Sequence, residues 1–215
     1  MDNELLIKFL EDKDTFRATW GYNFVDTSFE TMPSEFISFA EQDLQSSFGH
    51  KYINALSNAK RALDCQADRL LKLFGFYEES QNKFWGFPKK IELIQKFDIL
   101  APRVLTKINK TRNLMEHQYV KPDASQVEDF LDIVSLFIAS TDRFTSNSIT
   151  DVGYLNEENP AFKNYDEINF LIGKDKVTIS THRFKPKMDL EFSIVPTDKD
   201  YIEILKRHLK KMEFR

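Results

Sequence analysis

Five polar residues with different chemistry fall within eight positions of the chain. They are Arg112, Asn113, Glu116, His117 and Tyr119. On a helix each residue advances by about 100°, so the first four span one polar arc, from about 80° to about 220° when Val104 is set at 0°. Histidine exchanges protons near neutral pH, and arginine binds phosphate oxygens. This combination predicts a site for phosphoryl transfer.

The apolar residues of the same predicted helix place this arc at the edge of a core. They are Val104, Leu105, Ile108, Met115 and Tyr119, which fall within about 100° of one another. Arg112 could then lay its methylene groups on the core while its guanidinium reaches a cleft. Glu116 supports the site. The alternative remains that Arg112 and Glu116, four residues apart, form a surface ion pair worth only about 0.3 to 0.5 kcal/mol beside an exposed His117.

The composition is that of a globular protein in a reducing compartment. Among 215 residues, 41% are hydrophobic, and no apolar run approaches the length of a membrane span. The start of the sequence lacks the basic residues of a signal peptide, and Cys65 is the single cysteine. We expect a cytoplasmic protein without membrane contact. Since no His, Cys and carboxylate cluster has metal-ligand spacing, we expect neither a metal nor another cofactor.

The charges are unevenly distributed along the chain. Residues 173–215 carry 11 Lys and Arg against 7 Asp and Glu, although the whole chain has a net charge of -4. Lys206, Arg207 and Lys210 lie on one predicted helix and could contact RNA phosphates. The alternative is that these side chains form an ordinary solvated face.

Hydrophobic periodicity predicts a mainly α protein. We expect an N-terminal extension over residues 1–32, an antiparallel helical bundle over 33–147, and a small α+β unit over 152–215. That last unit should contain a three-stranded antiparallel sheet, with strands at 168–172, 177–179 and 189–195, and a helix over 197–212. Pro33 suits a first helical turn, Gly75 a helix end, and Asp123 with Gln126 a capping box.

At residues 112–119 the sequence resembles the HEPN family (higher eukaryotes and prokaryotes nucleotide-binding). Arg112-Asn113, three further residues and His117 match the arginine-polar-histidine signature of these helical bundles, and the similarity covers about residues 35–145. The resemblance implies a metal-independent endoribonuclease that acts as a homodimer, with both motifs lining one cleft. His117 would move the protons, Arg112 would stabilise phosphate charge, and Asn113 would orient His117 or bind a phosphate oxygen.

Tyr119 extends the resemblance. An arginine, four residues, a histidine, any residue and a tyrosine are similar to HEPN toxins, whose tyrosine is nucleotidylated by an antitoxin nucleotidyltransferase. This implies a toxin or host-defence setting with Tyr119 as the modification site. The alternative is that Tyr119 packs in the core, because it falls within the apolar stripe of its helix.

Two other functions remain open. A non-catalytic HEPN scaffold would bind a nucleotide or a protein through the same polar groove, and its binding would not depend on His117. A helical adaptor in which the motif arises by chance would place His117 far from any interface. The sequence specifies neither the RNA target nor the role of the C-terminal unit.

Overall fold

A computed structural model describes residues 1–22, 25–99, 121–145, 149–184 and 187–212. The chain divides into two compact units. The first, called here the α/β unit, comprises Met1–Asp26, Lys72–Glu79 and Asn147–Arg215. The second, called here the helical unit, comprises Thr27–Leu71 and Ser80–Ser146. The two parts of the helical unit thus lie in sequence between Asp26 and Asn147, on either side of Lys72–Glu79, and residues 1–26 belong with the C-terminal third.

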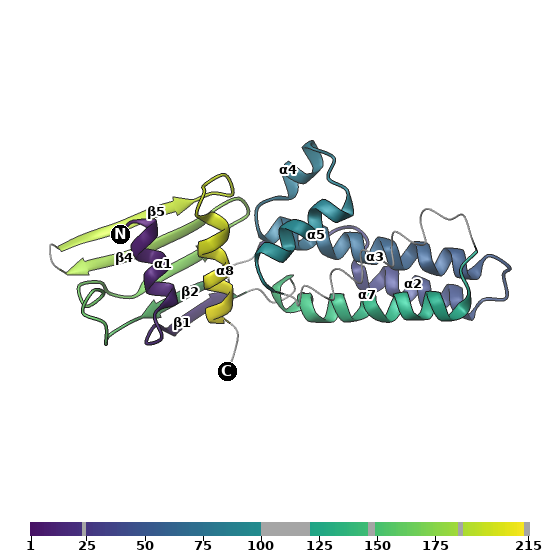
Figure 1. The fold of residues 1–215 in the computed structure, drawn as a ribbon, viewed down its shortest axis with the longest axis horizontal. Coiled ribbons are helices and arrows are strands. Elements are labelled where there is room, and N and C mark those ends of the chain that lie inside the picture. Colours follow the sequence, from purple (N-terminus) through teal and green to yellow (C-terminus); the bar gives the residue numbers. More distant parts are fainter. Residues whose placement is uncertain (23–24, 100–120, 146–148, 185–186, 213–215) are drawn as a thin grey trace. The chain divides into compact units, whose positions relative to one another are not determined.

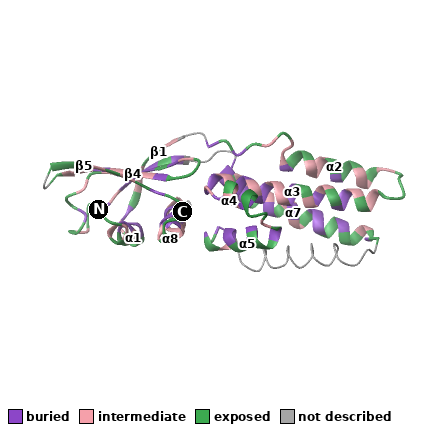
Figure 2. Cartoon of the chain, turned by 90° about the horizontal axis from the view of Figure 1, so that it is seen from above, coloured by how far each residue is buried: buried purple, intermediate pink, exposed green. Residues whose placement is uncertain are grey.

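The α/β unit is built on a five-stranded antiparallel sheet with two helices against it. The strands follow one another in sequence order from β1 to β5. They are β1 (Phe16–Tyr22), β2 (Ile149–Leu155), β3 (Ile168–Ile172), β4 (Val177–Phe184) and β5 (Lys187–Ile194). Helices α1 (Asn3–Glu11) and α8 (Tyr201–Met212) lie on the same face of the sheet (Figure 2). The core of this unit lies between that face and the two helices.

Alternating side chains explain which face of the sheet is covered. In β3, Ile168, Phe170 and Ile172 are buried, whereas Leu171 between them is 38% exposed. In α8 the buried side chains recur every three or four residues, which is the spacing of one helix face. They are Tyr201, Ile204, Leu205, His208 and Leu209. Each large apolar side chain removed from water in this way contributes about 1.5 to 3 kcal/mol.

The fold class predicted from the sequence is wrong in two respects, the overall class and the number of strands in the sheet. The protein is α+β, with seven helices and five strands among the described residues, not a mainly α bundle with a three-stranded sheet. The two unpredicted strands pair with each other across the insertion: Phe16 lies opposite Leu155, and Trp20 opposite Val152. Local pattern could not reveal them, because β1 contains a register shift and its partner follows the whole helical unit in the sequence.

Long helices make up the helical unit (Figure 1). They are α2 (Pro33–Gln45), α3 (Lys51–Leu73), α5 (Phe87–Lys96) and α7 (Ala124–Thr145), while the short α4 (Tyr77–Asn82) begins in the segment assigned to the α/β unit. Their shared core includes fully buried side chains from α3 and α7, among them Leu63, Leu70, Phe130 and Phe137. Helical spacing of these apolar residues made the elements predictable.

The ends of the helices follow their local sequence signals. Pro33 opens α2. Before α7, Asp123 Oδ1 accepts from Gln126 N–H at 2.8 Å and Gln126 Oε1 accepts from Asp123 N–H at 3.1 Å, which confirms the predicted capping box. Gly75 follows α3 with φ of 76°, a conformation that glycine adopts without strain. The stop predicted at Gly75 is confirmed.

Candidate functional site

The predicted motif lies outside the described residues. Arg112, Asn113, Glu116, His117 and Tyr119 all fall in residues 100–120, in the chain between α5 and α7. Their roles therefore stay predictions. The described part of the helical unit nevertheless shows how the two helices that flank this segment in sequence are held.

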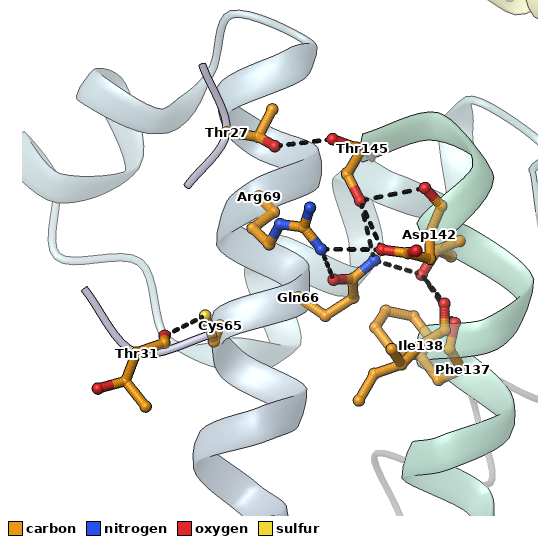
Figure 3. Close-up of polar contacts among 10 residues, drawn as sticks. Thr27, Thr31, Cys65, Gln66, Arg69, Phe137, Ile138, Asp142 and Thr145 are labelled. Carbon is orange, nitrogen blue, oxygen red and sulfur yellow. Dashed lines mark hydrogen bonds and ion pairs between the residues drawn. The ribbon is translucent and has the colours of Figure 1, made fainter. Parts of the chain in front are cut away.

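A buried polar network joins α3 to α7 (Figure 3). Arg69 is only 4% exposed, and its Nη1 donates to Gln66 Oε1 at 2.9 Å and to Asp142 Oδ1 at 3.0 Å. Gln66, fully buried, donates from Nε2 to Thr141 Oγ1 at 2.9 Å. Charged and amide groups removed from water require such partners, because each unmade hydrogen bond would cost about 1 to 3 kcal/mol. The network therefore specifies one register between the two helices.

Threonine hydroxyls extend the network along the last turns of α7. Thr141 Oγ1 donates to the carbonyl of Phe137 at 2.7 Å, one helical turn earlier, while it accepts from Gln66. The carbonyl of Thr145 accepts from Thr27 Oγ1 at 3.0 Å. The end of α7 is thus tied both to α3 and to the segment that precedes α2 (Figure 3).

Asp68, which precedes Arg69 on α3, forms an ion pair with Lys90 of α5. Asp68 Oδ1 lies 2.6 Å from Lys90 Nζ, and the two side chains are only 17% and 10% exposed. Adjacent residues of one helix thus anchor the two helices that precede and follow residues 97–123 in the chain. Since Arg69 and Lys90 are nearly inaccessible to solvent, these pairs position helices and do not bind substrate.

The basic residues proposed from sequence to touch RNA lie on α8, where Arg207 makes intramolecular ion pairs. Arg207 pairs with Glu203 on the same helix and with Glu11 of α1 at 2.5 Å. Lys210 is exposed, whereas Lys206 is partly buried. The guanidinium of Arg207 thus already has carboxylate partners within the α/β unit. RNA binding by this helix stays a prediction.

His208 is a buried titratable group that sequence reasoning did not single out. Its Nδ1 lies 3.1 Å from the Tyr154 hydroxyl, and its ring stacks on Phe170 with centroids 5.0 Å apart. Nε2 has no hydrogen-bond partner among the residues that the structure describes. Burial lowers the pKa of the imidazole to about 3, so the ring is neutral at pH 7. Its place in the apolar stripe of α8 was the available signal.

Two searches of the described ranges give negative results. No group of three or more His, Cys, Asp and Glu side chains there is arranged to hold a metal ion. No described helix combines the length and the apolar character needed to cross a membrane.

Comparison of the chain with known protein families, with curated proteins and with solved structures finds no match. Functional inference therefore depends on the residues of the chain and on the geometry described above.

Proposed function

We propose that this protein is a metal-independent endoribonuclease of the HEPN type. The observation that carries the proposal is the spacing of Arg112, Asn113 and His117, which matches the signature of that family. His117 would take the proton of a ribose 2'-hydroxyl or give one to the leaving 5'-oxygen. Arg112 would stabilise charge on the phosphate, and Asn113 would orient His117 or bind a phosphate oxygen. The product would carry a 2',3'-cyclic phosphate.

The helices on either side of the motif support this proposal. Asp68 binds Lys90 of α5, and Arg69 binds Asp142 of α7. Active sites require side chains held to within fractions of an ångström, and α5 and α7, which flank the motif in sequence, are both anchored to α3. The ion pairs, of which Asp68–Lys90 is buried and Arg69–Asp142 is partly buried, therefore suit a scaffold that must position polar groups precisely.

We propose that the working form is a homodimer. One chain supplies one motif histidine, whereas cleavage needs an acid and a base. By sequence, His50, His182 and His208 show no catalytic spacing relative to His117, and His208 is fully buried while His182 pairs with Asp189. Two copies of His117, one from each protomer, would provide both.

The same resemblance suggests a biological setting and a control step. We propose a cytoplasmic toxin or host-defence nuclease whose Tyr119 is nucleotidylated by a partner nucleotidyltransferase. A reducing compartment suits Cys65, the single cysteine of the chain. Lys210, exposed on α8, could add a phosphate contact for the RNA substrate.

The test is cleavage of a mixed RNA substrate in EDTA. Wild type and His117→Ala are compared, with the dimer verified by light scattering and His50→Ala as the matched control. His50 is exposed and stacks on Phe48, so its loss should not disturb the core. Cleavage by wild type and His50→Ala, and its loss in His117→Ala, are expected. Intact RNA with folded, dimeric wild type would overturn the proposal.

The second candidate function is a non-catalytic scaffold that binds a protein. Exposed apolar side chains around α2 and the start of α3 favour it: Phe39 is 43% exposed, Phe48 62% and Ile53 47%. Exposed apolar groups that gather in one region are typical of interaction sites. Partner binding that survives His117→Ala but is lost in Phe48→Ala would select this candidate over the nuclease.

A further inference from the structure

A pocket in the α/β unit has no role in the proposed nuclease. It has a volume of about 340 Å³ and lies where α1, the end of β2, the loop after β2 and the end of β4 meet. Four aromatic side chains line it: Phe9, Phe162, Tyr165 and Phe184. Small-molecule pockets occupy about 300 to 1,000 Å³. This pocket is therefore large enough for a small ligand only.

The loop that forms one wall is built on buried hydrogen bonds. Asn156, 7% exposed, donates from Nδ2 to Thr15 Oγ1 at 2.9 Å, and its Oδ1 accepts from the N–H of Asn159 at 3.0 Å. Asn159 in turn donates to Asp12 Oδ2 at 2.7 Å. These contacts join the loop to the segment between α1 and β1. The pocket is therefore organised before any ligand arrives.

The end of the same loop is held against β4. The N–H of Asp166 donates to the carbonyl of His182 at 2.8 Å, and the N–H of Phe184 donates to the carbonyl of Asn164 at 2.8 Å. These two bonds pair the end of the loop with β4. They place Tyr165 and Phe184, whose rings line the pocket, on two segments with a fixed separation.

The charges around the pocket favour a positive ligand. Its charged lining residues are Glu157, Asp166 and Lys163, two carboxylates against one ammonium group, and all three are exposed to solvent. The Glu157 side chain makes no hydrogen bond or ion pair with any other described residue, so its charge is available. Aromatic rings attract cations through their negative faces, and carboxylates add a direct charge interaction.

The chain itself places a cation on one of these rings. The guanidinium carbon of Arg183 lies 5.6 Å from the centre of the Tyr165 ring. Tyr165 thus already has a cation partner in the chain, so the rings open to a ligand cation are those of Phe9, Phe162 and Phe184. Arg183 is not among the residues that line the pocket.

We propose that this pocket binds a small organic cation, a guanidinium or alkylammonium group on a short carbon chain. Phe9 and Phe162, whose rings meet edge to face at 5.1 Å, would cover the carbon chain. Glu157 and Asp166 would pair with the positive group. Uncharged or anionic ligands of the same size would not form the attractive charge interactions with Glu157 and Asp166. The site is independent of the proposed nuclease and remains testable if that activity is absent.

The experiment is an NMR titration of the full-length, isotope-labelled protein with agmatine. Adipate and adipamide, which are close to agmatine in length, are the anionic and uncharged probes. We expect agmatine to shift the amide signals of residues 156–166 and 184. The double variant Glu157→Gln/Asp166→Asn should bind agmatine about fivefold more weakly, because each substitution removes one charge contact. Both changes conserve shape, and Asp166→Asn keeps an oxygen for the bond that Asp166 Oδ1 accepts from the N–H of Glu167.

Two single variants complete the design. Lys163→Ala should bind agmatine at least as tightly as wild type, because it removes a positive charge from the lining. Glu191→Gln, which changes an exposed carboxylate on β5 outside the lining, should bind like wild type and controls for net charge. Absence of agmatine binding, equal binding of adipamide or adipate, or unchanged affinity in the double variant would each overturn the proposal.

Discussion

The α/β unit and the helical unit are stabilised in different ways. Three separated segments build the α/β unit, and its first two strands pair although Phe16 and Leu155 are distant in sequence. Most of the helical unit consists of helices with regular apolar faces, and ion pairs with at least one buried partner join neighbouring helices. The α/β unit therefore depends on long-range strand pairing and on an apolar layer between sheet and helices. The helical unit depends on local helix formation and on polar side-chain contacts that align its helices.

The largest expected effect tests the apolar layer of the α/β unit. Phe170 is fully buried, stacks on His208 and contacts Tyr154 edge to face at 5.5 Å. Phe170→Ala should lower the free energy of unfolding by about 3 to 5 kcal/mol, because it removes a large side chain and leaves a cavity. Leu171→Ala, on the neighbouring exposed position, is the control and should cost about 1 kcal/mol or less. Denaturant titration measures both, and equal losses would contradict the assignment of the two faces.

The second prediction tests the polar contacts of Arg69 that join α3 to α7 in the helical unit. Arg69→Ala should lower the free energy of unfolding by about 3 kcal/mol, since it takes the charged donor away from Gln66 Oε1 and Asp142 Oδ1. Arg61→Ala changes an exposed arginine on the same helix and should stay within about 0.5 kcal/mol of wild type. Thermal and denaturant unfolding would show the difference. A loss in Arg69→Ala no greater than in Arg61→Ala would refute a structural role for the network.

The third prediction concerns acid stability of the α/β unit. Because burial lowers the folded-state pKa of His208 to about 3, the unfolded chain binds a proton first as the pH falls below the ordinary value of 6.5. The contribution of neutral His208 to the free energy of unfolding is complete above pH 6.5. Below that pH the contribution falls by about 1.4 kcal/mol per pH unit, until the pH reaches about 3.

Other groups also titrate in acid, so a variant isolates this contribution. His208→Leu keeps an apolar side chain against Phe170 and removes the titratable nitrogen. The pH dependence of its unfolding free energy between about pH 6.5 and about pH 4 should be shallower than that of wild type. Parallel curves for the two proteins would show that His208 does not carry the predicted proton linkage.

The smallest expected effect is local to one helix end. Asp123→Ala removes the carboxylate that accepts from Gln126 N–H, and it should cost about 1 kcal/mol of unfolding free energy. Asp123→Asn keeps an accepting oxygen and serves as the control, with a smaller loss. If both variants unfolded like wild type, the capping box would be irrelevant to the stability of α7.

Prediction from sequence succeeded where the determining contacts are local. The helix start at Pro33, the capping box at Asp123 and the pairing of residues 168–172 with 177–179 follow from spacing and turn chemistry within a few residues. It failed for β1 and β2, whose pairing partners are separated by the whole helical unit. The burial of Arg69 and Lys90 was also missed, since a charged residue on a helix gives no local sign of a buried partner.

The candidate sites divide in the same way. The spacing of Arg112, Asn113 and His117 is a property of the sequence, and it alone carries the proposed nuclease chemistry. The aromatic pocket is a product of tertiary structure, because Phe9, Phe162 and Phe184 come from three distant stretches of chain.

The sequence alone was sufficient for the bundle helices, for α8 and for the strands β3 to β5, because periodicity and capping act between residues a few positions apart. Only the tertiary structure decided that the first and last parts of the chain share one sheet, that His208 is neutral, and that Asp68 and Arg69 anchor two different helices. The physical reason is that strand pairing, desolvation and buried charge pairs arise between groups that only folding brings together.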